Sequence, residues 1–141
     1  MEFAKLAELI FQEAKFKLEK HKGLSIFARE RSKFEGWLKV ELCDSLARYF
    51  KDVAPERDRI DITFLDWAIE LKTVNTNYTF ANCKNKTRTI TKNVQAVIED
   101  IEKLKPIKYT NKAVLFVVFP AIHTHADWQD HLSKISCNLS E

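Results

Sequence analysis

Residues 59–73 read RIDITFLDWAIELKT, and this stretch decides the expected fold. Its two halves are rich in β-branched and aromatic side chains, which is typical of strands. A two-residue turn at 65–66 would join them as an antiparallel hairpin. Because side chains alternate between the faces of a strand, Asp61 would then lie opposite Glu70, with Cβ atoms roughly 5 Å apart. Lys72 would share the face of Glu70.

The charged residues of this hairpin have two interpretations. Two carboxylates at this short distance repel each other, and both lose hydration on a mostly buried sheet. A divalent cation such as Mg²⁺ would relieve this, because hard cations prefer clustered carboxylate oxygens, and Lys72 could then stabilise developing negative charge or orient a water molecule. The same spacing also fits a solvent-facing ladder in which Lys72 neutralises one acid. Spacing alone leaves both interpretations open.

The remaining sequence alternates between helical and strand-like patterns. Gly23 is a stop signal for the first helix, and Pro106 ends the third. The continuous apolar run of residues 112–120 predicts a strand that is buried on both faces. The order predicts an α/β fold, with helices flanking a mixed central sheet. The expected helices are 2–22, about 26–50, about 90–105 and about 126–135, and the expected strands lie within 49–56, 59–65, 67–74 and 112–120.

Composition fits one globular domain over residues 1–141. The chain is 45% hydrophobic and 30% charged, with two glycines and three prolines, which excludes collagen-like and disordered classes. No apolar run approaches the roughly 20 residues that cross a bilayer, and the acidic residues near the start are unlike a secretory signal. Three widely spaced cysteines indicate a reducing, cytoplasmic setting. A net charge of +3 permits a nucleic-acid partner.

The pattern RIDITF…WAIELK, preceded by an acidic helix and followed by a helix and a strand, resembles the PD-(D/E)XK nuclease superfamily. The resemblance covers residues 26–120, about two thirds of the chain, through a short motif. It implies a restriction-endonuclease-like core of order α-β-β-β-α-β, to which the 2–22 helix is an N-terminal addition. The pattern departs from the family where Ile60, rather than proline, precedes the first acid.

The resemblance assigns roles to the hairpin residues. Asp61 and Glu70 match the two acids that hold Mg²⁺ in the family, where Mn²⁺ can substitute, and Lys72 matches the lysine that helps to activate the attacking water. The family also places a glutamate on its first helix, for which Glu35 and Glu41 are both candidates. Residues 32–35, SKFE, form a capping-box pattern, so Glu35 could instead bond back to the start of the helix.

A basic segment follows the hairpin, with Tyr and Phe just before it. Lys84, Lys86, Arg88 and Lys92 occur without an intervening acid, and they could grip the phosphates of a nucleic acid. The alternative is a solvated basic loop. Gln95, on the third predicted helix, could face the metal, as a glutamine does in some branches of the family.

The sequence therefore predicts a metal-dependent nuclease that hydrolyses phosphodiester bonds, with DNA as the expected substrate. Two alternatives remain: a non-catalytic module for nucleic acid or protein on the same fold, and a structural subunit or homodimer that docks through the apolar stripe of residues 2–22. That stripe fits a core-facing surface as well. Residues 123–131, HTHADWQDH, have a metal-like composition but lack the spacing of a structural zinc site, which favours an exposed polar loop.

Overall fold

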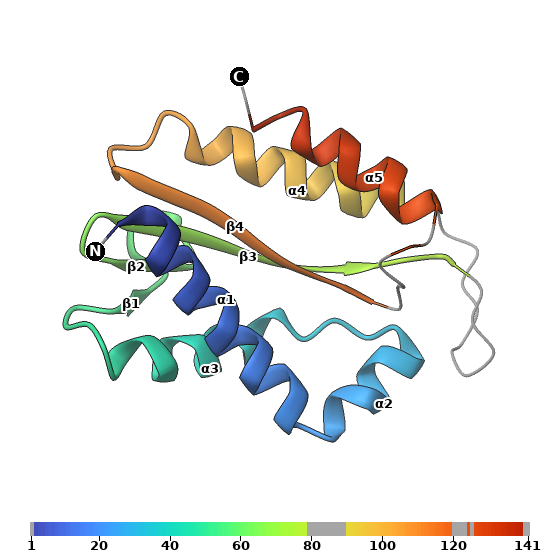
Figure 1. Ribbon diagram of the computed structural model, residues 1–141, viewed down its shortest axis with the longest axis horizontal. Helices are drawn as coiled ribbons and strands as arrows, with labels where there is room; N and C mark the ends of the chain where they lie inside the picture. The colour runs from blue at the N-terminus through green and yellow to red at the C-terminus, as the bar shows by residue number, and fades with distance from the viewer. Residues whose placement is uncertain (1, 79–89, 120–123, 125, 140–141) are drawn as a thin grey trace.

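The computed structural model describes residues 2–78, 90–119, 124 and 126–139. These residues form an α/β architecture in which helices cover both faces of a mixed sheet (Figure 1). The helices are α1 (Phe3–Lys20), α2 (Gly23–Glu30), α3 (Glu35–Ala47), α4 (Thr91–Leu104) and α5 (Ala126–Ser136), with a 3-10 turn, η1 (Arg57–Arg59). The strands are β1 (Ala54–Pro55), β2 (Ile62–Phe64), β3 (Trp67–Asn75) and β4 (Asn111–Phe119).

The sheet has the strand order β1-β2-β3-β4. β1, β2 and β3 are antiparallel neighbours, whereas β3 and β4 run parallel along their whole length. Ile62 pairs with Ile69 and Phe64 with Trp67, so the predicted hairpin and its two-residue turn are confirmed. The strand expected within 49–56 is also present, reduced to the two residues of β1.

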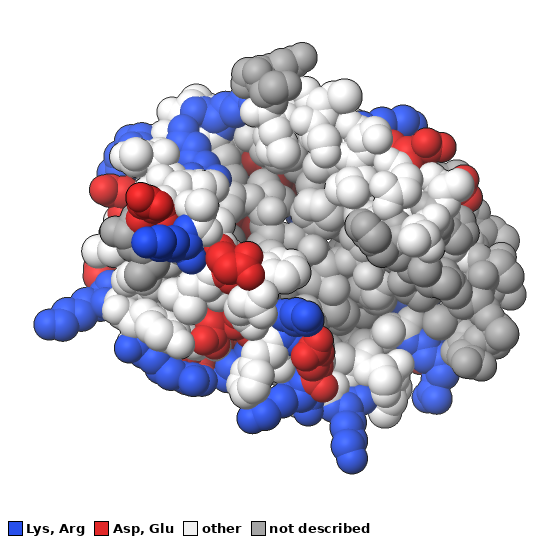
Figure 2. Space-filling view, viewed as in Figure 1, with Lys and Arg blue, Asp and Glu red and all other residues white. Residues whose placement is uncertain are grey.

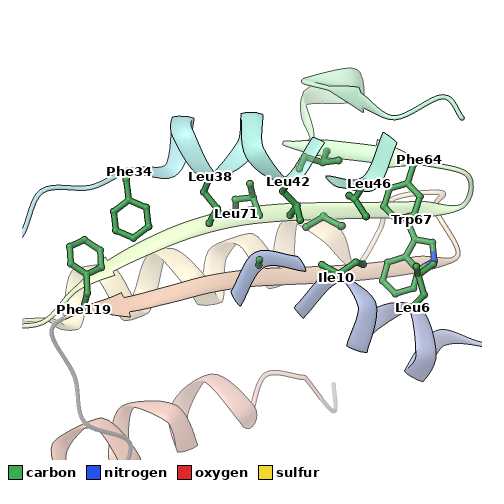
Figure 3. Packing of buried hydrophobic residues seen from close by; sticks show 13 residues of the cluster. Leu6, Ile10, Phe34, Leu38, Leu42, Leu46, Phe64, Trp67, Leu71 and Phe119 are labelled. Atoms are coloured by element: carbon green, nitrogen blue, oxygen red, sulfur yellow. The ribbon is translucent and has the colours of Figure 1, made fainter. Parts of the chain in front are cut away.

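Two apolar layers fix the helices on the sheet. On one face, Leu38, Leu42 and Leu46 recur every four residues along α3, so their side chains line one side of that helix. Figure 3 shows them directed at β3, with Leu6 and Ile10 of α1 closing the layer. On the other face the buried side chains come from α4, α5 and the end of β3, namely Val74, Val94, Val97, Ile101, Trp128 and Ile135.

The single helix expected over 26–50 is wrong, because the chain breaks between α2 and α3. Arg31 adopts left-handed backbone angles at the break, with φ 55°, and its side chain is only 1% exposed. The guanidinium donates to the main-chain oxygens of Thr76 and Tyr78. A buried charge needs such partners, so this contact favours the break. Gly23 was also expected to end the first helix, but α1 ends at Lys20 and Gly23 begins α2.

The expectation that β4 is buried on both faces is confirmed only in part, and β4 lies at the edge of the described sheet. Residues 111–118 are only partly buried, although their side chains reach both core layers. β3 is the sole strand that pairs with β4 among the described residues. An apolar sequence therefore shows that both faces of a strand are covered, but not that both of its edges are paired.

Candidate active site

The site begins where β2 ends and β3 continues alone. β2 has three residues and β3 has nine, so the edge of β3 beyond Ile69 has no strand partner on the β2 side in the described structure. Carboxylates take the place of that missing strand. The main-chain N–H of Leu71 donates to Asp61 Oδ2 at 2.8 Å, and that of Thr73 donates to Glu35 Oε1 at 2.7 Å. A short hairpin thereby gathers acids along one strand edge.

Asp61 and Glu70, the acid pair, meet at this edge. Their side chains share a hydrogen bond, and Glu70 is only 4% exposed. Burial and the neighbouring Asp61 carboxylate raise the pKa of Glu70 to about 7. The pKa of Asp61 is lowered despite burial, because Glu70, Lys39 and the Leu71 N–H all bond to its carboxylate. Near neutral pH, Glu70 is therefore protonated in a substantial fraction of the molecules.

Each member of the acid pair also contacts a lysine that the sequence reasoning missed. Lys39 Nζ of α3 lies 2.7 Å from Asp61 Oδ1 and also contacts Glu56. Lys103 Nζ of α4 lies 2.5 Å from Glu70 Oε1 and donates to the Arg59 oxygen at 2.8 Å. Both ammonium groups partly neutralise the acids.

Lys72 lies on the same side of the sheet and faces a further acid of α4. Its Nζ is 3.2 Å from Asp100 Oδ2, and the Asp100 side chain is 15% exposed. Burial raises the pKa of Asp100 against the opposing effect of Lys72, while Asp100, Glu35 and Asp61 together raise the pKa of Lys72. Lys72 is thus held as a cation beside the acid pair. Asp100 and Lys103 were missed, although both flank the buried stripe of α4, at Ile101 and Leu104, in the predicted helix.

The structure separates the two helix glutamates. Glu35 caps the edge of β3, accepting from both the N–H and the hydroxyl of Thr73, so it lies beside the site. The capping-box interpretation is wrong, because Phe34 is the N-cap of α3 and no side chain caps that end. Glu41 instead forms an ion pair with Lys17 of α1, at 3.0 Å. Of the two, Glu35 is therefore the candidate that remains.

The predicted nucleic-acid contacts are only partly described. Lys84, Lys86 and Arg88 lie outside the described residues, whereas Lys92 is exposed in the first turn of α4. Gln95 is also exposed on α4, and the residues of that helix that contact the acid pair and Lys72 are Lys103 and Asp100. His123 and His125 likewise lie outside the described residues.

The oxygen-rich donor set suits a magnesium ion better than a soft metal. No group of three or more His, Cys, Asp or Glu that could hold a metal occurs within residues 2–78, 90–119, 124 and 126–139. Mg²⁺ is commonly bound through only one or two carboxylates, with water and substrate phosphate completing its shell. Asp61 and Glu70 fit that smaller requirement, because a cation between them would counter the closeness of the two carboxylates, which together with burial raises the pKa of Glu70.

Within the described residues, no helix is long and apolar enough to cross a membrane. In comparisons with known proteins, no family model, no curated protein and no solved structure matches this chain.

Proposed function

We propose that this protein is a magnesium-dependent phosphodiesterase that cleaves nucleic acid, with DNA as the favoured substrate. The observation that carries the proposal is the contact of the buried Glu70 carboxyl with the half-buried Asp61 carboxylate, with Lys72 held beside them by Asp100. A buried carboxyl with a raised pKa, such as Glu70, is costly to a fold, and groups of this kind cluster at functional sites. The resemblance to PD-(D/E)XK nucleases supports the same reading of these residues.

The proposed reaction is in-line attack of water on a phosphodiester. The magnesium ion, when bound, would supply the positive charge that stabilises the phosphorane-like transition state. Asp61 and Glu70 would hold it, and Asp61 keeps its position because the Leu71 N–H binds its second oxygen. Lys72 would orient the attacking water or stabilise the charge that develops on the phosphate. Asp100 would keep the ammonium group charged and aimed at that position.

Positive charge around the acid pair fits a polyanionic substrate. Arg59 of η1 and Lys108, just after α4, are exposed, and so is Lys103, which also pairs with Glu70. Figure 2 shows Lys and Arg side chains gathering at the upper left, over the end of α4 that Figure 1 places there. Exposed cations of this kind neutralise backbone phosphates without reading sequence.

One observation favours a second candidate function, a non-catalytic nucleic-acid-binding module. Lys39 and Lys103 already neutralise the acid pair, so the fold does not depend on a metal to balance those charges. In this alternative the acids and lysines form a structural polar network, and the exposed cations bind nucleic acid without turnover.

Metal-binding calorimetry combined with cleavage assays separates the two candidates. We expect Mg²⁺ or Mn²⁺ to bind the protein and to permit cleavage of at least one member of a panel of labelled duplex DNA, single-stranded DNA and RNA. Lys72→Ala should retain most metal binding and lose cleavage by about 100-fold or more. Lys15→Ala, which removes an exposed lysine paired with Glu19 on α1, is the matched control and should cleave normally. Metal-independent nucleic-acid binding with no cleavage would support the module instead.

A further inference from the structure

A second candidate site lies at the start of α3, and its lining includes none of the residues of the acid pair. A cavity of about 370 Å³ opens where the end of α1, the start of α2 and the first turn of α3 come together. We call it the aromatic pocket. Its described lining is His21, Gly23, Leu24, Phe27, Lys33, Phe34, Gly36 and Trp37.

The lining of the aromatic pocket has a distinct chemistry. Three aromatic rings and one imidazole contribute to it, and Trp37 meets His21 and Phe34 edge to face, at ring-centroid distances of 5.2 and 6.3 Å. The described lining residues include no acid, and Lys33 supplies the one permanent charge. Such a surface suits a flat, apolar ring that carries a negative group.

The glycines give an independent indication that a ligand occupies the aromatic pocket. The chain has only two glycines, and both line the pocket. Gly36 lies in the first turn of α3, and its φ is not positive. Apart from its chain neighbours and the backbone of its own helix, no described atom lies within 4 Å of a Cβ built at this position. Neither backbone angles nor packing within the described protein therefore requires glycine, which weakens a helix relative to alanine. Close approach of a ligand to the backbone would require it.

The position of the pocket indicates what that ligand is. Glu35, which caps β3 beside the acid pair, stands between two pocket residues, Phe34 and Gly36. The first N–H groups of α3 have no side-chain cap, and Lys33 reaches Asn93 at the start of α4. A strand that crosses the α3 start could therefore place a base among the rings and its phosphate near Lys33.

We propose that the aromatic pocket binds one nucleobase of a single-stranded segment of the substrate, with the adjoining phosphate on Lys33. This inference rests on the proposed function, because it takes the occupant to be part of the nucleic acid that the acid pair would cleave. Base stacking on aromatic side chains is tolerant of sequence, so the pocket would secure the strand without selecting a base.

The test measures binding without catalysis. Fluorescence anisotropy in EDTA compares a labelled dT6 oligonucleotide with a hexamer in which abasic units replace every base. The variant is Gly36→Leu, which fills the pocket with a good helix former. We expect it to weaken dT6 binding about tenfold, the loss of one stacked base, and to leave abasic binding unchanged. Its melting temperature should stay level or rise by about 2 °C, since leucine favours the helix more than glycine does.

Val40→Leu is the matched control, because Val40 lies one turn further along α3, is 67% exposed and is outside the pocket lining. It should bind both oligonucleotides as the wild type does. Equal dT6 affinity of Gly36→Leu and wild type, or an equal loss for the abasic hexamer, would overturn the inference. A wild-type protein that cleaves no nucleic acid while Gly36→Leu still loses dT6 binding would refute the proposed function and leave the pocket standing.

Discussion

The burial of Glu70 beside Asp61 should be measurable as a dependence of stability on pH. The pKa of Glu70 is raised from 4.5 to about 7 in the folded protein. Between these values the folded chain keeps a proton on Glu70 that the unfolded chain releases, so the free energy of unfolding falls as pH rises through this window. Below about pH 4.5 both states are protonated, and this contribution is fully present.

The size of the effect follows from the shift. A change from 4.5 to about 7 corresponds to about 3 kcal/mol of lost stability once pH passes 7. The attraction of Lys103 is already contained in this shift, because it lowers the pKa of Glu70 against the larger effects of burial and Asp61. Glu70→Gln resembles the protonated carboxyl, so we expect the variant to exceed the wild type by about 3 kcal/mol at pH 8 and to match it near pH 4.5.

Urea denaturation in EDTA, repeated at half-unit steps from pH 4.5 to pH 8, measures this difference. Glu102→Gln is the control, since it removes the same charge from an exposed position of α4 that pairs with Lys105. Its unfolding free energy should follow the wild-type curve at every pH. Parallel curves for Glu70→Gln and wild type would show that the folded protein does not raise the pKa of Glu70, and the argument for a strained acid pair would fail.

Three further predictions concern Arg31, Glu35 and Asp100. Arg31→Met should lower the free energy of unfolding by about 3 kcal/mol, because it removes the buried guanidinium that donates to the main-chain oxygens of Thr76 and Tyr78. Thermal denaturation measures this, and a stability within 0.5 kcal/mol of wild type would contradict it. Glu35→Gln should reduce cleavage at least tenfold whereas Glu41→Gln should not, and equal rates for the two variants in a labelled-DNA assay would remove Glu35 from the site. Asp100→Asn should preserve the calorimetric affinity for Mg²⁺ while cleavage falls about tenfold, since only the alignment of Lys72 is disturbed; normal cleavage would show that Asp100 does not position it.

The two acids should respond differently to neutralisation. Asp61 accepts the Leu71 N–H and pairs with Lys39, and its pKa is lowered, so its contribution to stability is present above pH 3.8 and is lost as pH falls further. Asp61→Asn should therefore destabilise the protein at neutral pH. Sequence reasoning treats Asp61 and Glu70 as equivalent repelling charges, whereas their partners in the structure make them opposites.

Alternating side chains explain why the hairpin could be predicted. A two-residue turn admits one register for RIDITF and WAIELK, and that register alone brings Asp61 to Glu70. The periodicity of α1 and α4 was equally clear, since each helix buries one apolar stripe. Local patterns of this kind specify elements because they repeat within a few residues.

Contacts between distant segments were less visible in the sequence. The helix break at Arg31 depends on oxygens 45 and 47 residues further along the chain. The partners of the site from α3 and α4, such as Lys39, Asp100 and Lys103, depend on how those helices lie against β3. Helical spacing indicates that a charged residue flanks a buried stripe, but only packing decides which strand it meets.

The unequal lengths of β2 and β3 make two backbone amides into reporters of the site. The hydrogens of Leu71 and Thr73 are held by carboxylates rather than by a neighbouring strand. Amide hydrogen exchange at these two positions should therefore follow the state of Asp61 and Glu35, whereas Ile69, whose neighbour across the hairpin is Ile62, should exchange only as the sheet opens. A cation or a substrate that draws those carboxylates away would therefore speed hydrogen exchange at the Leu71 and Thr73 amides. Binding could then be followed from the main chain alone.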